Sequence, residues 1–198
     1  MRDKNSVKTL QNYLLQMGAV LPKFGIDGDL GKETKEAIDS LAIPEYVKIA
    51  LKEVGTEEIA GGVHNLRVLE YQATTSGKYT DDETPWCGAF ISWVMKQAGI
   101  KHNIKIPERA KEWIKFGYEV EEPEIGSIAI KSRIGGGHVC IVLGQRKDGK
   151  LYCLGGNQNN QVNIAIYDKE VFEAFRNIEK GKELSTLDLE TNKKVSEA

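Results

Sequence analysis

The sequence predicts an α+β fold, in which helices pack on an antiparallel sheet. Apolar residues recur at helical spacing as far as Phe116, whereas after Gly126 they follow a period of two, as strands do. The pair Asp148-Gly149, between two of these later runs, is a strong signal for a β-hairpin. Helices followed by antiparallel strands are typical of the α+β class.

Residues 1–43 form a small all-helical module in this interpretation. The first helix has apolar residues at helical spacing and ends at Gly18, and a second runs over about 32–41. A turn-rich stretch, 24–31, separates them. Pro44 marks the boundary, since the residue before a proline leaves the helical region. Two short helices bury little surface alone, so we expect the module to be docked on, or tethered to, something larger.

Residues 44–178 carry the larger domain, and residues 179–198 are a charged C-terminal tail. The helices expected in the larger domain are 46–54, 66–73, 86–98 and 107–116. The strands expected after them are 127–131, 138–144, 151–154 and 162–167. The tail lacks periodicity, which predicts a solvated or loosely packed segment.

Composition and charge exclude several classes of function. Hydrophobic residues make up 40% and charged residues 28% of the chain, as in soluble globular proteins. The net charge of −2 argues against nucleic acid as a partner. No apolar run is long enough for a membrane span, and the first residues lack a signal-peptide pattern. We therefore expect a protein made in the cytoplasm, with no membrane insertion.

Cys87 is the candidate nucleophile. With Cys140 and Cys153 it makes an odd cysteine count, which leaves at least one thiol unpaired. Cys87 lies at the first turn of the helix expected over 86–98, where the helix dipole and backbone N–H groups lower a thiol pKa and can bind an oxyanion. Gly88 leaves room for a carbonyl carbon beside the sulfur. The alternative is that Cys87 is a small buried hydrophobe.

His138 is the candidate base, because a thiol nucleophile needs a base, usually a histidine. Three glycines ending at Gly137 precede it and an apolar strand follows, so the imidazole can reach a cleft without crowding. His64 and His102 have polar neighbours and are expected near the surface. His138 could instead cap the edge of a strand.

The hairpin brings asparagines near the imidazole. If Asp148-Gly149 is a two-residue turn, Asn159 lies directly opposite His138 and Asn157 lies diagonally, on the same face. A different turn length would bring Gln158 onto that face instead.

The same two-residue turn places Cys153 opposite Gly144, which argues against a disulfide between Cys140 and Cys153. A zinc site made of His138, Cys140 and Cys153 is a weak alternative, because the chain has no close Cys-x-x-Cys pair. We expect no metal and no other cofactor.

The order Pro-Trp-Cys-Gly-Ala-Phe, Gly-Gly-His-Val and Leu-Gly-Gly-Asn-Gln resembles papain-like cell-wall cysteine hydrolases. These are the cysteine- and histidine-dependent amidohydrolase/peptidase (CHAP) family and its NlpC-type relatives. The likeness covers about 45–176 and is greatest to the phage endolysin branch, whose core reads Asp-Glu-Thr-Pro-Trp-Cys, here residues 82–87. It implies a papain-like domain that cleaves a peptidoglycan amide bond, as an N-acetylmuramoyl-L-alanine amidase or an endopeptidase.

The resemblance also implies roles for single residues. Cys87 would be the nucleophile, His138 the base and Asn157 the orienting residue. Many CHAP members carry an acidic residue two positions before that asparagine, where this chain has Gly155. Asn157, Gln158 and Asn159 therefore all stay candidates for the third catalytic position. Four residues are expected to contact substrate: Trp86, Gly88, Gly137 and Gln158. For Trp86 the alternative is a core anchor.

The N-terminal module resembles a small peptidoglycan-binding domain of the three-helix type. The matching segments are 10–14 and 25–31, with Leu30 at a position where that family often has an aromatic residue. Four residues of the loop are the expected wall-binding positions: Gly25, Asp27, Gly28 and Gly31. The alternative is a helical hairpin that only caps the catalytic domain.

Two other functions fit the same sequence. A wall-cleaving effector toxin, delivered into a rival cell and held by an immunity protein, would use the same residues. A non-catalytic wall-binding or assembly protein could keep the same shell. In each case we expect a monomer whose partner is bacterial peptidoglycan, and a hydrolase without a signal peptide would reach the wall after lysis or through a secretion machine.

Overall fold

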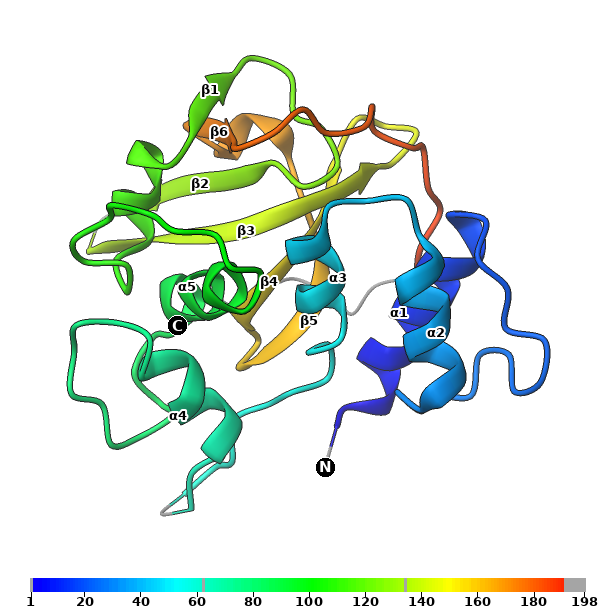
Figure 1. The fold of residues 1–198 in the computed structure, drawn as a ribbon, viewed down its shortest axis with the longest axis horizontal. Coiled ribbons are helices and arrows are strands. Elements are labelled where there is room, and N and C mark those ends of the chain that lie inside the picture. The colour runs from blue at the N-terminus through cyan, green and yellow to red at the C-terminus, as the bar shows by residue number, and fades with distance from the viewer. Residues whose placement is uncertain (1, 62, 134, 191–198) are drawn as a thin grey trace.

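A computed structural model describes residues 2–61, 63–133 and 135–190. In these ranges helices pack on one antiparallel sheet, which confirms the α+β class (Figure 1). The six strands lie in the order β1-β6-β2-β3-β4-β5. They are β1 (Tyr118–Val120), β2 (Ile128–Arg133), β3 (Gly136–Gln145), β4 (Leu151–Gln158), β5 (Gln161–Tyr167) and β6 (Ala174–Asn177).

The helices also follow the sequence pattern, and the segment expected over 107–116 is a shorter 3-10 helix. They are α1 (Lys4–Gln16), α2 (Lys32–Ser40), α3 (Glu45–Leu51), α4 (Leu66–Gln72), α5 (Cys87–Gln97), and the 3-10 helices η1 (Ala110–Lys115) and η2 (Lys169–Val171). Within the described ranges, no helix has the length and apolar character needed to cross a lipid bilayer.

The two N-terminal helices are packed onto the rest of the chain. α1 begins after Asp3, whose carboxylate accepts the Ser6 N–H at 2.7 Å. The Asp3 N–H donates to the Gly55 carbonyl at 2.9 Å, and the Ser6 hydroxyl donates to Gln161 in β5, also at 2.9 Å. The buried apolar residues of α1 and α2 belong to the same cluster as those of α5 and of one face of the sheet. The small helices thereby gain the buried surface that they lack alone.

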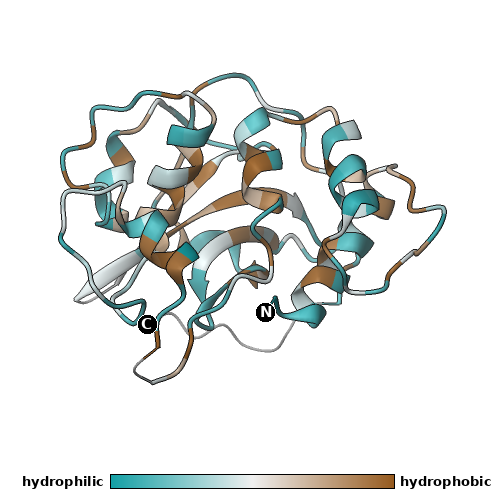
Figure 2. Cartoon of the chain, turned by 60° about the horizontal axis from the view of Figure 1, so that its bottom comes forward, coloured by the Kyte–Doolittle hydropathy of each residue, from teal (hydrophilic) through white to brown (hydrophobic). Residues whose placement is uncertain are grey.

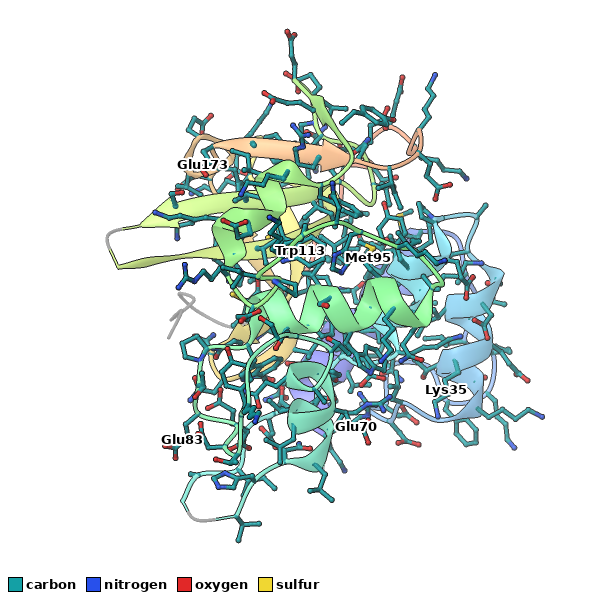
Figure 3. The ribbon with its side chains drawn as sticks, turned by 60° about the vertical axis from the view of Figure 1, so that its left-hand side comes forward. Lys35, Glu70, Glu83, Met95, Trp113 and Glu173 are labelled. Carbon is teal, nitrogen blue, oxygen red and sulfur yellow. The ribbon has the colours of Figure 1, made fainter. Side chains whose placement is uncertain are left out.

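The apolar core lies on both faces of the sheet, which Figure 2 shows as brown residues in the central strands and the adjoining helices. On one face α5 packs on β3 and β4, with Met95 and Trp113 fully buried between helix and sheet (Figure 3). On the other face Cys140 and Cys153 lie in a second cluster with aromatic residues around η2 and β6. Alternate residues of β3 therefore face different clusters.

The β3–β4 hairpin differs from the two-residue turn that the sequence suggested. The Arg146 N–H donates to the Lys150 carbonyl at 2.8 Å, so three residues, 147–149, form the turn. A further irregularity follows between Val142 and Gly144 in β3. As a result Cys153 pairs with Val142 and not with Gly144. The two shifts of one residue add up to two, so beyond Val142 the side chains of β3 and β4 share the same faces that a two-residue turn would give, with Cys140 and Cys153 in one cluster.

The C-terminal segment was expected to be solvated or loosely packed, and this is wrong for its described part. Leu187 and Leu189 are buried, with 3% and 5% of their surface exposed. The Leu189 N–H donates to the Tyr152 hydroxyl at 2.9 Å, and the Asp188 N–H donates to Gln16 of α1 at 2.9 Å. The alternation Leu187-Asp188-Leu189 is a strand-like pattern that the high charge of the segment concealed. Residues 191–198 lie outside the described ranges.

Candidate active site

Cys87 is the first residue of α5, as the sequence predicted. Its side chain is 6% exposed, and it lines a pocket of about 500 Å³ together with Pro85 and the glycines up to Gly137. All three cysteines lie in the described ranges and are thiols. The nucleophile candidate is therefore accessible from a pocket at a helix start.

Gly88 has a different role from the expected one. A Cβ at this position would lie 2.4 Å from the Pro107 carbonyl oxygen and 2.6 Å from that of Glu108. The space beside Gly88 is thus occupied by backbone, not open to substrate. Gly137 does line the pocket, and a Cβ there would lie 2.8 Å from the Lys131 carbonyl oxygen. Both glycines permit close approach of neighbouring backbone.

His138 lies in β3 with only 1% of its surface exposed. Its ring stacks on that of Tyr167, with centroids 5.9 Å apart and planes at 27°. Nε2 of the imidazole lies 3.0 Å from Oε1 of Gln158. The histidine is therefore held on one side by an aromatic ring and at one nitrogen by an amide.

The hydrogen bonds of Gln158 fix the protonation of Nε2 of His138. The Gln158 amide nitrogen donates to the backbone carbonyl of Asn163 at 2.8 Å, which can only accept, so the amide oxygen must face the imidazole. The Tyr167 hydroxyl donates to that same oxygen at 3.1 Å. Because an amide oxygen cannot donate, Nε2 of His138 carries the proton. In the neutral imidazole the basic nitrogen is then Nδ1.

The contact between Gln158 and His138 is possible because residue 155 is a glycine, which has no side chain. A Cβ at Gly155 would lie only 2.7 Å from Oε1 of Gln158. The register of β4 against β5 shifts between Gly155 and Gln158, and Asn157 within the shift has a positive φ of 56°. This bulge turns Gln158 toward His138.

Asn157, the residue first expected to orient the imidazole, contacts other groups. With its amide oriented to satisfy both neighbours, Asn157 accepts a hydrogen bond from the backbone N–H of Trp86 at 3.3 Å and donates one to Oε1 of Glu58 at 3.2 Å. The longer turn and the β3 irregularity shift the register by two residues in total and leave the faces unchanged, so the expectation fails because the bulge between Gly155 and Gln158 changes the side-chain parity of β4 there. Gln158, the alternative for a different turn length, is the residue beside His138.

Trp86 is fully buried, which fits the core-anchor alternative and not a contact with substrate. Its indole nitrogen donates to Glu58 at 2.7 Å, and its ring lies 5.7 Å from that of Tyr71. Burial raises the pKa of Glu58, the Trp86 hydrogen bond opposes this, and nearby carboxylates, chiefly that of Asp82, raise it further. No sequence motif marked Glu58, because it is brought to the site only by the fold.

Asp82 holds the loop before Cys87 in place. Its fully buried carboxylate accepts backbone N–H groups of Ile59 at 3.0 Å and Asn65 at 2.8 Å, and lies 3.0 Å from Nδ1 of His64. Burial alone would raise the pKa of Asp82, but these hydrogen bonds outweigh it and lower the pKa. Glu83 beside it points into solvent (Figure 3).

The described residues contain no group of three His, Cys, Asp or Glu side chains placed to hold a metal ion. His138, Cys140 and Cys153 therefore do not form the zinc site considered from the sequence. Burial raises the pKa of the Cys140 thiol well above its ordinary value, which disfavours the thiolate that a nucleophile requires.

The glycine-rich loop of the N-terminal module is held by internal hydrogen bonds. The buried amide of Gln11 donates to the Asp27 carboxylate at 2.7 Å and accepts the Gly28 N–H at 2.8 Å. Gly28 has a φ of +80° and passes close to Lys4, where a Cβ would lie 3.0 Å from the carbonyl oxygen. Asp27 and Gly28 thus shape the loop. Gly25 is likewise in a left-handed conformation, and Gly31 is the N-cap residue of α2.

Comparison with known families matches residues 79–157 to the CHAP domain. The match covers less than half of the chain and includes Cys87, His138 and Asn157, but ends before Gln158. It supports a cell-wall hydrolase of CHAP type, a class whose members are usually cysteine- and histidine-dependent amidases or peptidases. Comparison with curated proteins and with solved structures gave no significant match.

Proposed function

We propose that this protein is an endolysin-like peptidoglycan hydrolase with a papain-like catalytic domain, which cleaves an amide bond by thiol catalysis. One observation carries the proposal. Within the segment that matches the CHAP domain, Cys87 begins α5 and lines a pocket. The same pocket is lined by Gly137, the residue before His138, and the imidazole of His138 is held at Nε2 by the amide of Gln158. A thiol at a helix start and an oriented histidine are the parts that acyl transfer needs.

In the proposed mechanism Nδ1 of His138 takes the proton of Cys87. The thiolate attacks the carbonyl carbon of the substrate amide and forms a tetrahedral intermediate, whose oxyanion is stabilised by backbone N–H groups in the first turn of α5. The C–N bond breaks, and the imidazolium gives its proton to the leaving amine. Water, deprotonated by His138, then attacks the thioester and releases a carboxylic acid and the thiol.

Gln158 acts as a positioning residue in this mechanism. Its amide oxygen keeps the proton on Nε2 of His138 and so leaves the lone pair on Nδ1. Tyr167 supports the same state by stacking on the ring and by donating to the amide oxygen. A neutral orienting group serves here in place of the acidic residue that many CHAP members carry.

Lysis of purified cell wall, followed as loss of turbidity, tests the proposal. We expect wild type and Cys153→Ser to lyse the wall and Cys87→Ser and His138→Ala to be inactive. Cys153 is the matched control because it is a fully buried thiol that does not line the pocket. Equal lysis by wild type and Cys87→Ser would contradict thiol catalysis. Mass spectrometry of the released muropeptides then separates amidase from endopeptidase, since only an amidase frees an N-terminal alanine.

We further propose that residues 1–43 bind the wall. Support comes from a pocket of about 410 Å³ in this module, beside which Val20 and Phe24 expose 72% and 56% of their surface. Phe24→Ala in the Cys87→Ser background should reduce co-sedimentation with purified wall. The exposed Val171→Ala, in η2, is the control. Unchanged sedimentation of Phe24→Ala would favour the capping role instead.

A further inference from the structure

The pocket beside Cys87 has charged side chains on its wall. Those that line it are Glu108, Arg109, Lys111 and Glu112. They come from η1 and the residues directly before it, opposite the glycines that precede His138. The charges on this wall decide which substrate groups can lie next to the sulfur.

Each of the two carboxylates of the wall has one contact elsewhere in the chain. Glu112 forms an ion pair with Lys115 at 2.7 Å. Glu108 accepts a hydrogen bond from the Ser76 hydroxyl at 3.0 Å through one oxygen, and its second oxygen is buried without a hydrogen-bond partner among the described residues. Each carboxylate is therefore held in part by a residue outside the pocket.

The two cations differ from the carboxylates in this respect. Arg109 and Lys111 are exposed, and no carboxylate in the described ranges forms an ion pair with either of them. The stem of Lys111 also packs near Gly137, where a Cβ would lie 3.2 Å from its Cγ. The charged groups of the wall that are both exposed and without an ion pair among the described residues are thus the two cations.

We infer that Arg109 and Lys111 bind a carboxylate of the substrate, next to the amide that Cys87 attacks. The guanidinium of Arg109 can hold a carboxylate through two parallel hydrogen bonds, and the Lys111 ammonium adds a point charge. The preferred substrate is then a peptide with a free carboxylate close to the scissile bond, and its carboxamide analogue is a poor one. This inference rests on the proposed function only for the identity of the substrate.

Alkylation of Cys87 tests the charge of the pocket without any hydrolysis. Iodoacetate carries a carboxylate and iodoacetamide is neutral, and peptide mapping by mass spectrometry reads Cys87 separately from the buried Cys140 and Cys153. In Arg109→Gln/Lys111→Gln, the rate ratio of iodoacetate to iodoacetamide should fall by about 10-fold, as loss of charge-assisted hydrogen bonds predicts. Lys101→Gln/Lys147→Gln removes equal charge elsewhere and should keep the wild-type ratio.

A pair of synthetic peptides, one with a free carboxylate beside the scissile amide and one with a carboxamide, gives the second readout. Wild type should favour the carboxylate peptide in kcat/KM by about 10-fold, and the double variant should lose this preference. An unchanged alkylation ratio in the double variant overturns the inference, even if the wall is lysed. A reduced ratio in a protein that cleaves no wall supports the carboxylate site and rejects the hydrolase.

Discussion

The amide oxygen of Gln158 lies 3.0 Å from Nε2 of His138, in space that a side chain at residue 155 would fill. A Cβ on Gly155 would approach that oxygen to 2.7 Å, closer than nonbonded atoms pack. The glycine and the glutamine are therefore coupled, since one leaves the room that the other uses. This coupling explains how the imidazole can be oriented without an acidic residue at position 155.

Gln158→Ala should lower kcat by about 10- to 100-fold with a smaller change in KM, because the imidazole loses its fixed proton at Nε2. Asn177→Ala is the control, since Asn177 is also a buried, hydrogen-bonded amide but lies in β6. It should lose stability and keep kcat. Nitrogen NMR of His138 should show a mixture of tautomers in Gln158→Ala, and a single unchanged tautomer would contradict the positioning role.

Gly155→Ala should by itself lower kcat, because the new Cβ displaces the Gln158 amide from His138. The double variant Gly155→Glu/Gln158→Ala places a carboxylate in the vacated space and should recover about 10-fold in kcat over Gln158→Ala. Wall turbidity measures both variants. Full activity of Gly155→Ala, or no recovery in the double variant, would contradict the coupling.

Asn157→Gly removes the side chain and keeps the backbone conformation, since glycine readily adopts the φ of 56° found at this residue. We expect a loss of about 1–2 kcal/mol in the free energy of unfolding, because Glu58 and the Trp86 N–H each lose a hydrogen bond. The loss of kcat should be smaller than in Gln158→Ala. A larger loss would return Asn157 to the orienting role that the sequence first suggested.

Asp82→Asn should lower the free energy of unfolding by about 2 kcal/mol near neutral pH, because a buried carboxylate that accepts two backbone N–H groups is replaced. The pKa of Asp82 is lowered in the folded state, so its contribution is present above its ordinary value of 3.8 and is lost as the pH falls through the folded-state pKa. The difference between wild type and variant in urea unfolding should therefore shrink below pH 3.8. If the difference in the free energy of unfolding between wild type and Asp82→Asn does not depend on pH, the lowered pKa of Asp82 in the folded state is contradicted.

Leu187→Ala should destabilise the protein by about 2–3 kcal/mol, since it leaves a cavity where the C-terminal segment packs over Gly144. The exposed Val171→Ala should change the free energy of unfolding by less than about 0.5 kcal/mol. Thermal unfolding of both variants checks this. Equal stability of Leu187→Ala and wild type would mean that the segment behaves as the solvated tail expected from its charge.

Local patterns in the sequence predicted most of the elements and the place of the two reactive residues. Helical and strand periodicities are properties of short segments, so they predicted α5 beginning near Cys87 and β3 running through His138. The short strands β1 and β6 were not predicted, because three or four residues carry too little alternation to recognise.

Only the tertiary structure decided which amide meets His138. A bulge between Gly155 and Gln158 changes the side-chain parity at the end of β4 and exchanges Asn157 for Gln158. It also decided that Glu58 contacts the indole of Trp86, since their contact joins segments 28 residues apart. The sequence by itself determined which groups can do chemistry here. Strand register and packing, which depend on distant contacts, determined how those groups are paired.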